Sequence, residues 1–363
     1  MRFSWKLNMH MQITPATLSV SKPLAKTARE RVLFAFGAKD RNQFFPSLSL
    51  ENLPHSGHRF DTDSLKNYDH WEGFLKEFRP TILVSCWSTP RLPDPLLHTD
   101  ALPLRYLCHT TGTVRNLVGR EFLVEGGVVS NWGNVISQNV AEHALMLILT
   151  SLRSFTRWRE TMKEGQEVWG NGQFVKTRSL QGKTVGLHGF GKIARELLAL
   201  LAPFNVECIA FSPNVPPGVM RKKGVTPCAD LKELFRKSDV VVECEALTEE
   251  TLASVTEAHF RMMKEDAVFV NVGRGAVIDE DALLRVAKEG RIRVALDVFQ
   301  TEPLPKDSPL WDVEHMILSP HLAGPAGDWF HRCGDHALSN VDRYLKGKPL
   351  VGEVTLELYD RST

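Results

Sequence analysis

A regular alternation of short apolar runs and helical stretches begins at residue 184, and this feature most constrains the fold. Runs typical of buried strands occur at 184–187, 206–211, 240–244, 267–272, 294–298 and 316–318. Helical stretches separate most of these runs. Because parallel strands need crossover connections, usually helices, the alternation predicts six parallel strands in a doubly wound sheet.

An earlier part of the chain predicts a second, smaller α/β unit. Its strand-like runs are RVLFAF (31–36), TILVSCW (81–87), LRYLCH (104–109) and VVSN (128–131), with a helical piece at 71–78. We further expect one long helix from 139 to about 164, an irregular arm at 165–181, and a helix from 321 to about 347 that returns to the first unit.

A glycine pattern lies at the start of the larger unit. Gly189-x-Gly191-x-x-Ala194 follows the first predicted strand and opens a helix, which is the setting that a dinucleotide-binding turn requires. Gly189 permits the tight turn, and Gly191 lets the backbone approach a pyrophosphate. The free N–H groups at the helix start attract the phosphates.

These patterns predict an α/β fold in which a doubly wound, parallel-sheet Rossmann domain is inserted into a smaller flavodoxin-like α/β domain. The expected boundaries are a tail at 1–28, the smaller domain at 29–132 and 322–363, and the dinucleotide-binding domain at 133–321. The tail lacks the apolar segment and cleavage site of a secretory signal.

Composition excludes several functional classes. The 44 basic and 43 acidic residues nearly cancel, so we expect neither nucleic acid nor a membrane as a partner. The longest apolar run, 144–149, falls far short of the roughly 20 residues that span a bilayer. Six scattered cysteines without a CxxC pair indicate a reduced, cytoplasmic protein. The cluster His331, Cys333 and His336 lacks further ligands, so no metal is predicted.

The choice between NAD and NADP stays open. About 20 residues after the glycines, where an acidic residue would bind the ribose of NAD, the chain has Ser212. The serine removes the repulsion against a 2′-phosphate, but no arginine follows it directly. We interpret Arg221, Lys222 and Lys223 as a solvated run of charges.

Three segments place ionisable residues just past predicted strands, where ligands bind in parallel sheets. They are NVGRG (271–275), DVFQTEPL (297–304) and SPHLAG (319–324). Arg274 could grip a carboxylate with two hydrogen bonds. His321 could exchange a proton near neutral pH, and Glu302 could hold its other ring nitrogen.

The motifs GKTVGLHGFGKIA, VNVGRGAVIDEDAL, ALDVFQTEPLP and SPHLAG, in this order, resemble those of the D-isomer-specific 2-hydroxyacid dehydrogenases, from about residue 31 to 347. The resemblance implies hydride transfer between a nicotinamide cofactor and a pair of D-2-hydroxy acid and 2-oxo acid. It also implies a homodimer built through the nucleotide domains and the arm at 165–181.

The resemblance also assigns site residues. It implies that Arg274 binds the substrate carboxylate and that His321, assisted by Glu302, is the general acid and base. The implied cofactor residues are Gly189, Phe190, Gly191, Lys192, Ile193, Ser212, Val272, Gly273, Asp297 and Gly324. The loop Thr111, Gly112 and Thr113 would hold the substrate carboxylate, and residues 130–133 and 139–143 resemble the interdomain hinge and its helix.

Two departures from the family pattern stand out. Ser212 replaces the usual aspartate, and Ala246 stands where a proline is usual, which predicts a looser loop beside the adenine. Two rival functions are a corepressor-like, nucleotide-sensing protein with little turnover and a formate dehydrogenase, in which a glutamine would replace Glu302. The intact Arg274, Glu302 and His321 favour the dehydrogenase acting on 2-hydroxy acids. The sequence leaves open which 2-hydroxy acid is the substrate.

Overall fold

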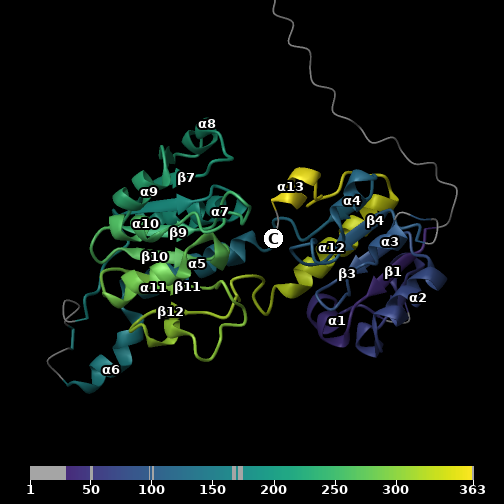
Figure 1. Cartoon of the computed structure of the whole chain (residues 1–363), viewed down its shortest axis with the longest axis horizontal. Coiled ribbons are helices and arrows are strands. Elements are labelled where there is room, and N and C mark those ends of the chain that lie inside the picture. Colours follow the sequence, from purple (N-terminus) through teal and green to yellow (C-terminus); the bar gives the residue numbers. More distant parts are fainter. Residues whose placement is uncertain are drawn as a thin grey trace, which may run out of the picture.

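The computed structural model describes residues 30–49, 52–97, 99, 102–165, 169–170 and 175–361. Within these residues the strands form two sheets in which every paired strand is parallel. Figure 1 shows the sheets in two lobes that lie side by side. The predicted tail at 1–28 lies outside the described residues.

The first lobe contains, in its described part, a five-stranded sheet of order β2-β1-β3-β4-β5, which is the flavodoxin-like order. Its strands are Val32–Ala35 (β1), His58–Phe60 (β2), Ile82–Ser85 (β3), Tyr106–His109 (β4) and Val128–Ser130 (β5). Its helices are Ala38–Phe44 (α1), Tyr68–Phe78 (α2), Asp94–Leu97 (α3), Arg120–Val124 (α4), Phe330–Leu345 (α12) and Leu356–Asp360 (α13).

Apolar side chains cover both faces of this first sheet, as parallel strands require. On one face, Phe44 of α1, Cys333 of α12 and Phe34 of β1 belong to one apolar core. On the other face, Trp71 of α2 and Leu33 of β1 belong to a second core. Helix α12 comes from the C-terminal part of the chain, yet Figure 1 shows it among the N-terminal elements.

The second lobe contains, among the described residues, a seven-stranded sheet of order β12-β11-β10-β9-β6-β7-β8. Its strands are Thr184–His188 (β6), Glu207–Phe211 (β7), Thr226–Pro227 (β8), Val240–Glu243 (β9), Val268–Asn271 (β10), Arg293–Leu296 (β11) and Ile317–Leu318 (β12). Its helices are Ser137–Leu152 (α5), Trp158–Lys163 (α6), Lys192–Leu201 (α7), Pro217–Arg221 (α8), Leu231–Lys237 (α9), Glu257–Met262 (α10) and Glu280–Lys288 (α11).

Helices cover both faces of the second sheet as well. Leu147 of α5 and Leu197 of α7 belong to the core of one face. Phe260 of α10 and Leu283 of α11 belong to the core of the other. Since this sheet lies in the chain between β5 and α12, the structure confirms the predicted fold class, a doubly wound domain inserted into a smaller α/β domain.

The predicted count of six strands is wrong for the described part of the second lobe, because β8 adds a seventh at the edge. Strand β8 spans two residues and includes Pro227, so it carries neither the length nor the composition of a strand. Strand β2 of the first lobe was not predicted either, because its sequence HRF is mostly polar.

The single helix predicted from 139 to 164 is also wrong. Helix α5 ends at Leu152, and Ser154 has a φ of 51°, in the left-handed region. The Leu152 carbonyl accepts a hydrogen bond from the Arg178 backbone N–H at 2.8 Å, and Arg293 Nη1 donates to the Ser151 carbonyl at 2.8 Å. Distant residues therefore satisfy the last carbonyl groups of the helix, and the local sequence does not show this.

The helix predicted to begin at residue 321 begins instead at Phe330. The preceding segment is irregular and is bound at both ends. The His321 N–H donates to the Asp297 carbonyl at 2.9 Å, and Trp329 Nε1 donates to the Val135 carbonyl at 3.0 Å. These two contacts tie the irregular segment before Phe330 to the second lobe and to the hinge.

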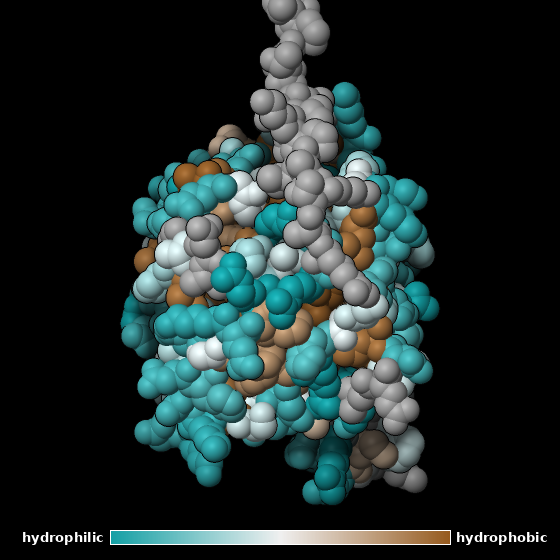
Figure 2. Space-filling model, turned by 90° about the vertical axis from the view of Figure 1, so that its right-hand side faces the viewer, coloured by the Kyte–Doolittle hydropathy of each residue, from teal (hydrophilic) through white to brown (hydrophobic). Residues whose placement is uncertain are grey.

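Figure 2 shows one face of the molecule, on the side of the first lobe. This face has several hydrophobic areas separated by hydrophilic residues. In the described part of the chain, no helix is both long and apolar enough to cross a membrane. All six cysteines are free thiols, and within the same part no group of three His, Cys, Asp or Glu side chains could hold a metal ion. Cys333 lies in the core, and His336 contacts the Asn131 carbonyl.

Candidate active site

The carboxyl ends of β6 and β9 form the point where the strand order of the second sheet reverses. Open parallel sheets bind ligands in the crevice at such a point. The loops that follow these two strands contain Gly189 and Glu245, and they touch. A Cβ atom on Gly189 would lie 2.7 Å from the Glu245 backbone nitrogen, and Gly189 has a φ of 91°. Only glycine fits this turn.

The start of α7 fits a phosphate group. Gly191 is the residue before the first turn of the helix and has no side chain to cap it. A Cβ atom on Gly191 would meet nothing within 4 Å, so the space beside this backbone is open to a ligand. Uncapped N–H groups at a helix start attract anions. The turn therefore fits the pyrophosphate of a dinucleotide.

Phe190, Lys192 and Ile193, the other residues of the glycine turn, differ in how far their side chains are exposed. The Phe190 side chain is fully buried, with the Arg195 guanidinium 5.6 Å from its ring centre. Ile193 packs against the same core, whereas Lys192 is exposed at the helix start. Phe190 can thus offer a ligand only its backbone, and Lys192 can offer its charge.

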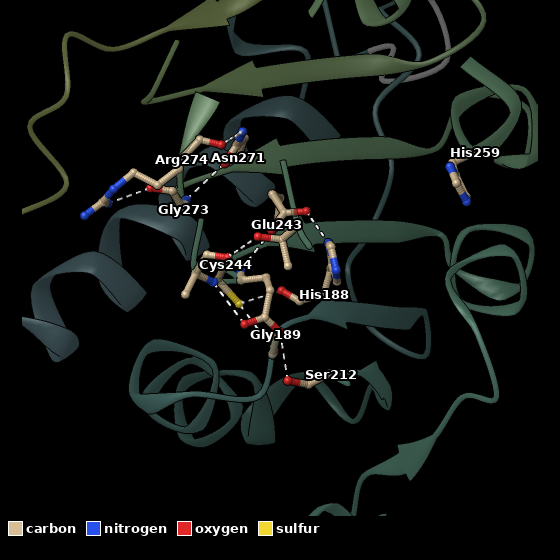
Figure 3. Close-up of polar contacts among 12 residues, drawn as sticks. His188, Gly189, Ser212, Glu243, Cys244, His259, Asn271, Gly273 and Arg274 are labelled. Carbon is tan, nitrogen blue, oxygen red and sulfur yellow. Dashed lines mark hydrogen bonds and ion pairs between the residues drawn. The ribbon is translucent and has the colours of Figure 1, made fainter. Parts of the chain in front are cut away.

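Ser212 follows β7 and is buried beside the same loops. Its hydroxyl donates a hydrogen bond to Glu245 Oε2 at 2.8 Å. Figure 3 shows Ser212 on the side of Gly189 and Cys244. The sequence reasoning missed Glu245, because this residue is distant from Ser212 in the chain and only the strand order brings it there.

The loop after β10 lies on the other side of the switch point. Asn271 Oδ1 accepts from the Gly273 N–H at 3.0 Å, and Asn271 Nδ2 donates to the Arg274 carbonyl at 3.2 Å. A Cβ atom on Gly273 would lie 3.1 Å from the Glu245 carbonyl oxygen, and Val272 is buried. The loop therefore packs closely on the loop after β9, as Figure 3 shows.

The Arg274 guanidinium contacts the backbone of its own loop. Its Nη1 donates to the Gly273 carbonyl at 2.8 Å. Although the residue is exposed, desolvation by its surroundings lowers the pKa of the guanidinium, and the Glu302 carboxylate acts in the opposite direction. An arginine remains protonated under these conditions, so Arg274 supplies a fixed positive charge near Glu302.

His321 and Glu302 are in direct contact. His321 Nδ1 lies 2.6 Å from Glu302 Oε2, and the other carboxylate oxygen accepts from the Phe299 N–H at 2.9 Å. The His321 side chain is 48% exposed. A carboxylate at Nδ1 keeps a proton on that nitrogen, so Nε2 is the atom available to a ligand.

Asp297 holds the segment that carries His321. Its carboxylate accepts hydrogen bonds from the Ser319 hydroxyl and the N–H groups of Leu322 and Ala323, and His143 Nε2 lies 3.4 Å away. Burial alone would raise the pKa of Asp297, but these contacts outweigh burial and lower it. These internal donors occupy most of its acceptor positions. Gly324, at the end of the segment, leaves open space beside its Cα.

The predicted substrate loop lies in the first lobe. The Thr111 hydroxyl contacts His109 Nε2 at 2.6 Å, and the Thr113 hydroxyl oxygen is buried without a hydrogen-bond partner among the described residues. A Cβ atom on Gly112 would lie 2.8 Å from the Trp132 ring. Within the described ranges, no hydrogen bond or ion pair joins this loop to Arg274, Glu302 or His321 in the second lobe.

The predicted hinge nevertheless contacts both loops. Asn131 Nδ2 donates to the Gly112 carbonyl at 2.7 Å, and the Trp132 N–H donates to the Thr111 carbonyl at 3.2 Å. On the other side, His143 of α5 lies 3.0 Å from the Ser319 hydroxyl. The connection between the lobes is thus attached to the substrate loop and to the segment that carries His321.

Comparison with known proteins identifies the family. The model of the D-isomer specific 2-hydroxyacid dehydrogenase NAD-binding domain matches residues 145–323. A glyoxylate reductase of Thermofilum pendens is 34% identical over 281 residues, which are 76% of this chain and 82% of that protein. The chain belongs to the D-isomer-specific 2-hydroxyacid dehydrogenases. The resemblance inferred from the motifs is thereby confirmed.

Two other relatives define how far this likeness extends. A D-3-phosphoglycerate dehydrogenase of Methanocaldococcus jannaschii is 32% identical over 225 residues, and the match covers 62% of this chain but only 42% of that protein. The crystal structure of apo D-mandelate dehydrogenase from Rhodotorula graminis has a TM-score of 0.74 at 23% identity and covers 90% of this chain and 98% of that one. The second likeness shows the fold alone.

The chain carries a buried ion pair beneath the nucleotide turn that could not be assigned from the sequence. His188, the last residue of β6, contacts Glu243, the last residue of β9, and both are buried (Figure 3). Burial alone would lower the pKa of His188, but the Glu243 carboxylate outweighs it and raises the pKa. The other Glu243 oxygen accepts from the Glu245 N–H at 2.8 Å, so the pair anchors the loop after β9.

The loop at Ala246 is not loose, contrary to the expectation from the sequence. The Thr251 hydroxyl donates to the Ala246 carbonyl at 2.6 Å, and the Ala246 N–H donates to Glu245 Oε1 at 3.0 Å. A proline has no N–H and could not make the second bond. The alanine therefore fixes the loop and, with it, the Glu245 carboxylate.

Proposed function

We propose that this chain is an oxidoreductase that transfers a hydride between a nicotinamide cofactor and a D-2-hydroxy acid or its 2-oxo acid. The observation that carries the proposal is the contact between His321 and Glu302 at the carboxyl end of a sheet whose family binds NAD. A bound reduced nicotinamide cofactor would supply the hydride. The glycine turn at 189–191, with the exposed Lys192, would hold its pyrophosphate.

The proton chemistry belongs to His321. In the reductive direction its Nε2 donates a proton to the carbonyl oxygen at C2 of the 2-oxo acid, and in the oxidative direction it takes a proton from the hydroxyl. Glu302 keeps Nδ1 protonated and the ring oriented through the 2.6 Å contact. Because His321 is half exposed, a substrate can reach Nε2.

Arg274 would bind the substrate carboxylate and stabilise the negative charge that develops on the carbonyl oxygen. The loop Thr111–Thr113 would bind the same carboxylate from the other lobe once the lobes close on the substrate. The buried Thr113 hydroxyl, without a partner among the described residues, is a donor suited to this task.

The test is a panel of carbonyl compounds, each offered with NADH and with NADPH, with the loss of reduced nicotinamide absorbance as the readout. We expect reduction of at least one 2-oxo acid, such as glyoxylate, hydroxypyruvate or a bulkier analogue. The matched aldehydes and ketones without a carboxylate should be reduced far more slowly, because Arg274 has nothing to bind. Equal rates with and without the carboxylate would contradict the proposal.

A corepressor-like binding protein is the rival function, and it would not need an oriented imidazole. The His321–Glu302 contact is a proton-transfer arrangement, which favours the enzyme. Binding of the cofactor without turnover of any compound in the panel would favour the rival.

We further propose a homodimer built through the second lobes and the arm at 165–181. This arm is described only in part, at 165, 169–170 and 175–181. Trp169 is 67% exposed, as expected of a side chain that a second copy covers. Light scattering should give twice the mass of one chain. A monomer at micromolar concentration would contradict this part of the proposal.

A further inference from the structure

The Glu245 carboxylate lies where a nucleotide-binding sheet of this kind reads the adenosine ribose. In such sheets an acidic residue at the end of the second strand hydrogen-bonds the ribose hydroxyls of NAD. Here that strand is β7, and Ser212 follows it. Glu245 Oε2 lies 2.8 Å from the Ser212 hydroxyl. The loop after β9 therefore supplies a carboxylate beside the position where the usual acidic residue is replaced by serine.

The position of Glu245 is fixed by its own loop. Its N–H donates to Glu243 Oε1 at 2.8 Å, and its Oε1 accepts from the Ala246 N–H at 3.0 Å. Its backbone packs against Gly189 so closely that a Cβ atom there would lie 2.8 Å from the Glu245 Cα. The residue that would read the ribose is therefore in contact with the turn that would hold the pyrophosphate.

The carboxylate keeps unused acceptor capacity. A carboxylate has about four lone-pair sites, and within the described residues the donors to it are the Ser212 hydroxyl and the Ala246 N–H. No Lys or Arg side chain in the described ranges forms an ion pair with Glu245. Since the residue is 6% exposed, its negative charge acts on a neighbouring ligand with little screening.

The residues directly after Ser212 supply no arginine for a 2′-phosphate. Ser212 is followed by Pro213 and Asn214, and neither can grip a phosphate as an arginine would. Arg221, at the end of α8, and Lys222 and Lys223 after it are exposed. In the described part of the chain, no contact joins any of the three to Ser212 or Glu245.

We propose that Glu245 accepts hydrogen bonds from the 2′- and 3′-hydroxyls of the adenosine ribose and repels a 2′-phosphate, so that this chain selects NAD over NADP. The inference rests on the proposed function, since it takes a nicotinamide dinucleotide as the ligand. Ser212 is then a positioning residue, whose hydroxyl orients the carboxylate.

The experiment uses the full chain and two fragments of the cofactors, 5′-ADP and 2′,5′-ADP, which lack the nicotinamide. Isothermal titration measures both dissociation constants without any turnover. The readout is the dissociation constant of 2′,5′-ADP divided by that of 5′-ADP. We expect the wild type to bind 5′-ADP at least about tenfold more tightly. Glu245→Gln keeps the shape and removes the charge, and it should lower this ratio at least about tenfold. Glu245→Asp keeps the charge and should keep most of the discrimination.

Glu207→Gln is the matched control. It removes the same charge from the start of β7, at the opposite end of the strand that leads to Ser212, where Glu207 is exposed. Its ratio should equal that of the wild type. Circular dichroism confirms that each variant is folded.

The outcomes separate the two proposals. A folded Glu245→Gln protein with an unchanged ratio overturns the role of Glu245 and leaves the proposed function standing. Equal affinity of the wild type for the two fragments also overturns the role of Glu245, even if the Glu245→Gln variant does not fold. Failure of the wild type to bind either fragment overturns both the inference and the nucleotide-dependent function. A lower ratio in Glu245→Gln alone supports the inference.

Discussion

The imidazole of His321 is the residue on which the proposed chemistry depends most directly. His321→Ala should lower turnover of the best 2-oxo acid by about 100-fold or more, since that is the usual contribution of a general acid. Binding of the cofactor fragments should not change, because His321 lies at the end of a different loop. Steady-state kinetics and titration measure the two effects. Turnover within threefold of the wild type would remove His321 from the mechanism.

Single residues also show where reasoning from the sequence succeeds and where it stops. The contact between His321 and Glu302 could be predicted, because both follow strands of one parallel sheet and their chemistry is complementary. The role of Ser212 could not be judged from its own position. The carboxylate beside it comes from Glu245, and only the pairing of β6 with both β7 and β9 makes the two residues neighbours.

The loops at the carboxyl ends of β10 and β11 interlock at Gly275. A Cβ atom on this glycine would lie 1.9 Å from the Phe299 carbonyl carbon, which belongs to the backbone leading to Glu302. Gly275→Ala should therefore destabilise the protein by about 2 kcal/mol or more and lower turnover by displacing Glu302.

Urea denaturation measures the loss of stability, and Gly218→Ala is the control. A Cβ atom on Gly218, in α8, would meet nothing within 4 Å, so its effect should stay within about 0.5 kcal/mol. Equal free energies of unfolding of the two variants would contradict this prediction, because the backbone around Phe299 would then move at little cost.

Strands with a continuous apolar run could be predicted from the sequence. Elements whose ends or pairing depend on contacts with distant residues could not. The apolar runs that became β6 and β10 stand out in the sequence, because strands buried on both faces are continuously apolar. The end of α5 at Leu152 depends instead on Arg178 and Arg293, which lie far along the chain. Strand β8 is defined only by its pairing with β7.

The stability of the whole molecule should depend on pH through His109. This residue is buried between the Ser85 and Thr111 hydroxyls, and burial lowers its pKa to about 4. Its ordinary pKa is about 6.5, so between these values the unfolded chain binds a proton that the folded chain does not. Stability should therefore fall as the pH falls from about 6.5 to about 4, by roughly 3 kcal/mol in all.

Urea midpoints measured across this pH range test the dependence. His109→Asn should be less stable near neutral pH but should show a flatter profile toward acid. His55→Asn is the control, because His55 is exposed and asparagine tolerates its left-handed backbone. A profile as steep in His109→Asn as in the wild type would assign the acid sensitivity to other groups.

The position of α12 has a consequence for synthesis of the protein. Helix α12 covers the apolar face of the first sheet, but Phe330–Leu345 leaves the ribosome only after all strands of the second sheet. Nearly three hundred residues are therefore translated between Phe34 and Phe44 and the helix that completes their core. Chains fold domain by domain as they emerge. The second lobe is therefore completed before the first lobe, although the first lobe starts earlier in the chain.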